Sequence, residues 1–140
     1  MGLLFRNCAG GIVFYENRAL LMRNEKDEWV MPKGVIREGG DMRRVALNRV
    51  KIEAGVEAEI LASAGETCYE FYSVTRKRPV CNRIQWFIMR AKADSCAPAA
   101  PFTEAAFFEK EAALEKITST QDRSLLAVAW EKYSEIAEKM

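Results

Sequence analysis

Residues 34–56 read GVIREGGDMRRVALNRVKIEAGV, a glycine-rich loop followed by a helical pattern. Asp41 is a residue type that accepts hydrogen bonds from the free amides at the start of a helix, and a glycine such as Gly55 is a residue type that commonly ends one. The sequence therefore predicts a helix that begins after Asp41 and ends at Gly55.

One face of this predicted helix is apolar but contains a charged pair. At about 100° per residue, Met42, Ala46 and Val50 share a face, and Arg49 and Glu53 lie within it. A pair at positions i and i+4 on such a face is typical either of a partly buried structural ion pair or of the remnant of a functional site. The residues alone leave both interpretations open.

Strand-like and helical patterns alternate along the rest of the chain. We expect a hairpin over 6–25, an apolar run at 29–31 stopped by Pro32, strands over 57–73 and 80–91, a basic turn at 75–79, a loop over 93–101, a short helix over 110–117 and a final amphipathic helix. Thr118 and Gln121 resemble a capping box for that final helix. Gly10 and Gly11 indicate a bulge or a close approach of backbone in the first strand.

Composition limits the classes of function. The chain has 140 residues and a net charge of +1, so we expect one domain over 1–140 and no strong nucleic-acid signal. We find no apolar stretch of membrane-spanning length and no signal peptide, and we therefore expect a cytoplasmic protein without a membrane partner. The chain has no histidine, which excludes histidine bases and ligands. Cys68 and Cys81 could face each other across a hairpin, although in the cytoplasm we expect reduced, buried thiols.

The loop and helix resemble the signature of the Nudix family, G-x5-E-x7-R-E-U-x-E-E-x-G-U, in which U is a bulky apolar residue. Anchored on Gly34, the glycine and apolar positions match at Val50, Gly55 and Val56. Residues 29–34, WVMPKG, resemble the W-x-x-P-K-G segment of diadenosine polyphosphate hydrolases, and the similarity continues over nearly the whole chain. The resemblance implies the α/β class, with an α/β/α sandwich around a mixed sheet.

The signature is degenerate at its charged positions. Gly40, Arg49 and Ile52 stand where the family has glutamates, Asn48 stands where it has arginine, and Glu53 alone is retained. In active members these carboxylates bind Mg²⁺ or Mn²⁺, which bridges substrate phosphates before water attacks phosphorus. An arginine about 4 Å from a divalent ion would oppose binding by several kcal/mol at an effective dielectric constant of about 20.

The resemblance implies a nucleotide or another phosphorylated small molecule as the ligand, bound with weak or no hydrolysis. Arg49 would supply a fixed positive charge in place of the metal and offer two donors to a phosphate. The other candidate ligand-binding residues are Lys33 and Arg37 in the loop and Tyr69 and Trp86 on the later strands.

Two alternatives remain open from the sequence. The first is an active Mg²⁺- or Mn²⁺-dependent hydrolase of nucleoside diphosphate-linked substrates, with Glu53 as its catalytic residue and Glu53 and Glu104 as metal ligands, assisted by Glu38 or Asp41. The second is a regulatory or protein-interaction module on the same scaffold. The basic turn fits either a solvated hairpin tip or a ligand contact, and the oligomeric state is undetermined.

Overall fold

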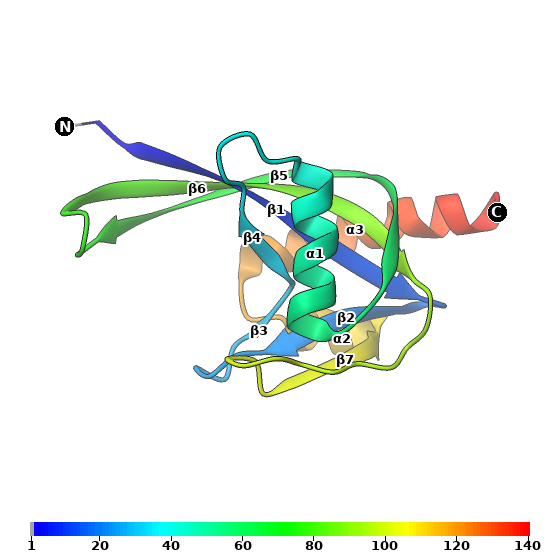
Figure 1. Cartoon of the computed structure of the whole chain (residues 1–140). Helices are drawn as coiled ribbons and strands as arrows, with labels where there is room; N and C mark the ends of the chain where they lie inside the picture. The colour runs from blue at the N-terminus through cyan, green and yellow to red at the C-terminus, as the bar shows by residue number, and fades with distance from the viewer. Residues whose placement is uncertain (1) are drawn as a thin grey trace.

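A mixed β-sheet with helices on both faces forms the centre of the structure, a computed structural model that describes residues 2–140 (Figure 1). Its strands are β1 (Leu4–Tyr15), β2 (Arg18–Arg23), β3 (Trp29–Val30), β4 (Lys33–Val35), β5 (Ala58–Ser73), β6 (Arg78–Ala91) and β7 (Glu104–Glu109). Helix α1 (Met42–Ala54) covers one face, and α2 (Lys110–Lys116) and α3 (Thr120–Glu138) cover the other. The α/β/α sandwich expected from the resemblance is confirmed.

The sheet combines one parallel strand pair with several antiparallel ones. Its main order is β3-β2-β1-β6-β5, with β4 paired to β1 and β7 paired to β2. Strands β1 and β6 run parallel from Leu4 opposite Val80 to Phe14 opposite Arg90. Strands β5 and β6 form a long antiparallel hairpin, so β5 lies at the edge of the sheet.

Two hydrophobic cores lie on the two faces, because successive side chains of a strand point in opposite directions. On one face, Phe14 and Trp86 belong to a cluster with Trp130 of α3. On the other face, Val13 packs in a cluster with Val50 of α1. Within residues 2–140, no helix is long and apolar enough to cross a membrane.

Both predicted ends of α1 are confirmed. The Asp41 side chain accepts a hydrogen bond from the Arg43 amide at 3.0 Å. Gly55 has a φ of 70° and donates its amide to the Lys51 carbonyl at 3.0 Å. These caps fix where the helix begins and ends, and therefore which of its residues face the neighbouring loop.

The Gly55→Ala variant should be destabilised by about 2 kcal/mol or more, because the left-handed conformation already opposes a side chain there. An added Cβ would also lie 2.8 Å from backbone atoms of Ala97, which cannot rotate away. Urea unfolding of the two proteins measures this difference. A Gly39→Ala variant is the control, since Gly39 also has a positive φ, 76°, but no atom within 4 Å of the added Cβ. Equal losses in the two variants would show that Ala97 makes no difference.

The start of α3 differs by one residue from the expected capping box. Ser119, not Thr118, caps the helix, and its hydroxyl accepts from the Asp122 amide at 3.2 Å. The Thr118 hydroxyl instead accepts from the Trp29 amide at 2.8 Å, which connects the helix start to β3. Two neighbouring hydroxyl residues both fit the sequence pattern, and this tertiary contact determines which one caps the helix.

Cys68 and Cys81 form a disulfide, so the expectation of reduced, buried thiols is corrected. The register of the β5–β6 hairpin places Cys68 opposite Arg83 and Cys81 opposite Glu70. The two cysteines are therefore diagonal neighbours on one face, with their Cα atoms 6.5 Å apart. Cys81 is buried, whereas Cys68 is exposed.

Candidate functional site

The charged pair on α1 lies against the glycine loop. An Arg49 Nη1 atom is 3.7 Å from Glu53 Oε2, and the two side chains are 40% and 15% exposed. The stem of Arg49 crosses Gly34, where an added Cβ would lie 2.7 Å from Arg49 Cγ and Cδ. Gly34 thus leaves room for a guanidinium group that stays partly open to solvent.

The carboxylate of Glu53 is largely buried and poorly solvated. Its Oε1 atom is buried and has no hydrogen-bond partner among the described residues. Burial raises the pKa of Glu53, while the charges of Arg49 and Lys33 and the nearby Lys33 backbone amide oppose that rise. Glu53 is therefore linked to both Arg49 and Lys33, and it has an acceptor atom that no described residue satisfies.

The Glu53→Gln variant should be more stable than the native chain at pH 7 and equally stable at low pH. Because burial raises the pKa of Glu53 above its ordinary value of 4.5 in the folded chain, ionisation is less favourable there than in the unfolded chain. The native chain therefore loses stability as pH rises through the folded-state pKa, and a neutral amide removes that loss. Thermal unfolding from pH 3 to pH 8 checks this. A native chain more stable than the variant at pH 7 would mean that the Arg49 interaction outweighs burial.

A cavity of about 530 Å³ lies between the β2–β3 loop, β4, the β5–β6 hairpin and the start of α3. Its walls include Lys33, Tyr69 and Ile84 of the sheet and Gln121 and Asp122 of α3. Burial raises the pKa of Asp122, and the Lys33 charge opposes that rise. The Lys33 ammonium therefore influences carboxylates on both α1 and α3.

Arg37 lies at a different cavity. A smaller hollow of about 260 Å³ is lined by Arg37, Arg49, Val35 and Ile52, among others. The sequence placed Lys33, Arg37 and Arg49 around one ligand, whereas the structure distributes them over two hollows. Glu53 is not among the lining residues of either hollow, but burial raises its pKa and the charges of Arg49 and Lys33 both lower it.

The two candidate aromatic residues have different environments. Tyr69 is 40% exposed and lines the larger cavity. Trp86 is fully buried, and its indole NH donates to the Thr67 hydroxyl at 2.8 Å. The expectation that Trp86 contacts a ligand is therefore corrected. Its ring packs over Gly10, where an added Cβ would lie 2.6 Å away, which confirms the close approach expected at that glycine.

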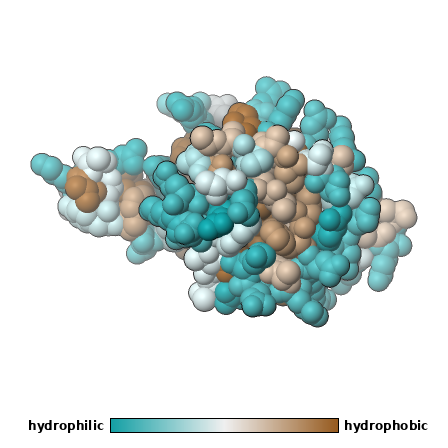
Figure 2. Space-filling view, turned by 90° about the horizontal axis from the view of Figure 1, so that it is seen from below, coloured by the Kyte–Doolittle hydropathy of each residue, from teal (hydrophilic) through white to brown (hydrophobic). Residues whose placement is uncertain are grey.

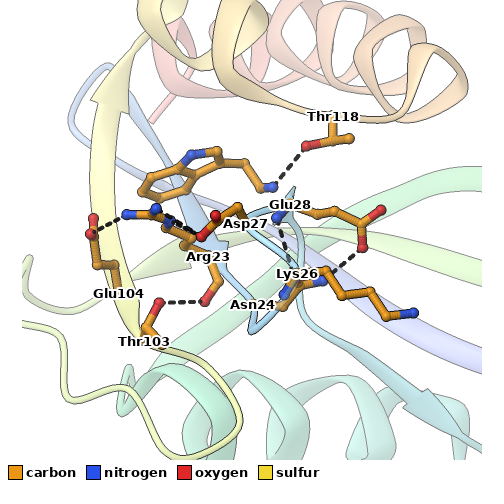
Figure 3. A network of polar contacts seen from close by, with 9 residues as sticks. Arg23, Asn24, Lys26, Asp27, Glu28, Thr103, Glu104 and Thr118 are labelled. Atoms are coloured by element: carbon orange, nitrogen blue, oxygen red, sulfur yellow. Dashed lines mark hydrogen bonds and ion pairs between the residues drawn. The ribbon is translucent and has the colours of Figure 1, made fainter.

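Glu104, the second candidate metal ligand, belongs to a separate surface network (Figure 3). Its carboxylate accepts from Arg23 Nη1 at 2.9 Å, and Asp27 accepts from the same guanidinium at 2.8 Å. Across residues 2–140, no group of three or more acidic or cysteine side chains converges in a way that could hold a metal ion. Glu53 and Glu104 thus do not form a site, and the residues present do not fit Mg²⁺ or Mn²⁺.

The sequence did not identify Asp122 and Gln121 as candidate site residues. Both lie in the first turn of α3, and Gln121 Nε2 donates to the Cys68 carbonyl at 3.2 Å. An acidic residue in the first turn of a helix normally indicates only favourable interaction with the helix dipole. The signal that identifies these residues is their place in the fold, opposite Lys33 and Tyr69.

Comparisons with known proteins agree on one family. The NUDIX domain model matches residues 4–139. A NUDIX hydrolase from Nitrosomonas europaea is 17% identical, with a TM-score of 0.74 over 96% of this chain and 75% of that chain. An Ap4A hydrolase from C. elegans is also 17% identical, with a TM-score of 0.67 over 95% of this chain and 99% of that one. A MutT protein from Methanosarcina mazei is 12% identical, with a TM-score of 0.74 over 95% and 98%. At these identities the structural matches establish the fold.

Proposed function

Because this chain belongs to the Nudix family, we propose that it binds a nucleotide or another phosphorylated small molecule beside Arg49, Glu53 and Lys33, with weak or no hydrolysis. Members of this family generally act on nucleotide-linked small molecules with the help of Mg²⁺ or Mn²⁺. We therefore propose that this chain binds the family's class of ligand without a metal ion. The proposal depends mainly on one observation, the Arg49–Glu53 pair on α1.

Arg49 has the features of a phosphate-binding residue. Its side chain is 40% exposed, and the 3.7 Å separation from Glu53 is longer than a hydrogen bond, which leaves its donors available. A guanidinium group can donate two parallel hydrogen bonds to a phosphate, and its charge persists at every physiological pH. Gly34 supports this arrangement, since any side chain at that position would collide with the Arg49 stem.

The larger cavity, which is lined by Lys33 and not by Arg49, has the dimensions and lining for the nucleoside part of a ligand. Its volume of about 530 Å³ lies within the ordinary range of small-molecule sites. Lys33 offers a positive charge, Tyr69 offers an aromatic ring, and Asp122 and Gln121 offer polar atoms. Together they could contact the phosphates, the face of a base and its polar edge.

We expect weak or absent hydrolysis because too few carboxylates are available around Glu53. A hard divalent cation requires several oxygen ligands, and here Glu53 is the only box glutamate, with Arg49 beside it. Asp41 is engaged as the cap of α1, and Glu104 pairs with Arg23. None of these side chains supplies the second and third ligands around Glu53.

The test is hydrolysis of diadenosine tetraphosphate, ADP-ribose, dinucleotide cofactors and nucleoside triphosphates with Mg²⁺ and with Mn²⁺. The native chain is compared with Glu53→Ala and with the isosteric Glu53→Gln. We expect the native chain to show no more turnover than either variant. Turnover that both variants lose would establish an active hydrolase with relocated carboxylates and would overturn the proposal.

A further inference from the structure

The end of the β5–β6 hairpin projects beyond the body of the protein together with the start of β1 (Figure 1). This projection, residues 4–6 and 69–82, is called the ribbon below. It carries five of the large hydrophobic side chains that are exposed, namely Phe5, Tyr69, Phe71, Tyr72 and Val74. Figure 2 shows apolar surface on the projecting part, bordered by hydrophilic atoms. Tyr69 and Phe71 lie on one face of the ribbon and Phe5 and Tyr72 on the other. Exposed apolar side chains grouped in this way favour an interaction surface.

Positive charge is concentrated in the same region. The ribbon contains the cations Arg6, Arg76, Lys77 and Arg78 and the acid Glu70. Every ion pair among the described residues lies outside this region. The region therefore has a net charge of +3, which the total of +1 for the whole chain conceals.

One face of the ribbon presents two aromatic rings in a row. Tyr69 and Phe71 point to the same side of β5, with ring centroids 6.0 Å apart and planes inclined by 31°. Asn82 donates to the Tyr69 hydroxyl at 2.7 Å and accepts from Arg6 Nε at 2.9 Å. The Arg6 guanidinium also lies 5.9 Å from the centre of the Phe71 ring. These contacts hold both rings and a positive charge in a fixed arrangement.

This aromatic face leads into the larger cavity. Tyr69 belongs to both, and Ile84, two residues beyond Asn82 on β6, lines the cavity floor. The disulfide between Cys68 and Cys81 joins the two strands next to Tyr69 and Asn82, so the ribbon is fixed where it leaves the body. A ligand that begins in the cavity therefore meets the rings of Tyr69 and Phe71 in succession.

We infer that the ribbon binds single-stranded nucleic acid, with a terminal nucleotide in the cavity and the following bases on Tyr69 and Phe71. The location of the terminal nucleotide rests on the proposed function, whereas binding to the ribbon does not. Surfaces that combine stacked aromatic side chains with a positively charged border bind single strands without sequence preference. An acidic protein would also match the charge. Base stacking on two neighbouring aromatic rings beside a cavity of nucleotide size favours a nucleic acid instead.

The experiment measures fluorescence anisotropy of a labelled twelve-residue oligouridylate and of an oligodeoxythymidylate of the same length at two salt concentrations. Phe71→Ala should weaken binding about tenfold, the effect of losing one stacked base. Arg76→Glu with Lys77→Glu should weaken it further and reduce the salt dependence by roughly 0.7 per lost phosphate contact. The control is Lys132→Glu with Lys139→Glu, which makes the same charge change at exposed positions on and just after α3.

The inference is wrong if the native chain does not bind either oligonucleotide, or if the ribbon and control variants bind equally well. It is also wrong if sedimentation shows that Phe71→Ala disrupts a dimer while oligonucleotide binding is unchanged, because the ribbon would then be a contact between copies. Calorimetric titration with ADP on the same variants separates the two proposals. Retained ADP binding with no oligonucleotide binding contradicts the ribbon alone, and the reverse contradicts the cavity alone.

Discussion

Replacing Arg49 and Ile52 together by glutamate should make the chain bind Mn²⁺ through α1. With Glu53, the variant has carboxylates at three positions of one helix face, as the Nudix signature requires. Both replaced side chains are partly exposed, 40% for Arg49 and 60% for Ile52, so the exchange disturbs little packing. At a Mn²⁺ concentration 100 times the dissociation constant, the free energy of unfolding should rise by about 2.7 kcal/mol.

A variant with Arg44→Glu and Lys51→Gln is the matched control for this experiment. It makes the same total change in charge on the same helix, but at exposed positions that do not line the hollow between α1 and the glycine loop. Thermal unfolding with and without Mn²⁺ should show stabilisation of the first variant and not of the control. Equal responses would mean that added negative charge, rather than the restored constellation, attracts the ion.

The Trp130→Ala variant should lose about 3–5 kcal/mol of stability, the largest loss we expect from a single substitution. Trp130 is 2% exposed, and its ring meets Phe14 edge-on at a centroid distance of 5.1 Å. Its indole NH also donates to Asn17 Oδ1 at 3.0 Å, in the turn between β1 and β2. Removing the ring therefore leaves a cavity and removes a hydrogen bond where α3 joins the sheet.

Trp29→Ala is the comparison for Trp130→Ala, because Trp29 is only partly buried at the edge of the same core. Its loss of stability in urea should be clearly smaller. If both variants lost the same amount, the contact of α3 with the sheet would not be the main stabilising element on that face. A loss below about 1 kcal/mol for Trp130→Ala would show that the core can close around the gap.

The sequence predicted the elements well where local chemistry determines them. Asp41 and Gly55 fix the ends of α1 through their own hydrogen-bonding and backbone preferences. The cap of α3 was displaced by one residue, because Thr118 and Ser119 both have a suitable hydroxyl and the contact with Trp29 is long-range. The disulfide depended on the register of β5 against β6, which composition does not define.

The candidate site was predictable only in part. The family pattern pointed to Lys33 and Arg49. Arg49 Nη1 lies 3.7 Å from Glu53 Oε2, and the Lys33 charge opposes the rise that burial causes in the pKa of Glu53. The family pattern does not indicate which face of β6 is buried. It therefore predicts a ligand contact for Trp86, which lies in the core. Asp122 was missed because it is distant in sequence and approaches Lys33 only through the packing of α3.

Calorimetric titration with ADP in the presence of EDTA tests most directly whether Arg49 replaces the metal ion in phosphate binding. The native chain should bind ADP equally well with EDTA and with Mg²⁺, and Arg49→Ala should weaken binding about tenfold or more, the effect of a lost charged hydrogen bond. Lys51→Ala, on the exposed side of α1, should bind as the native chain does. ADP binding that requires Mg²⁺, or that survives Arg49→Ala unchanged, would contradict the account.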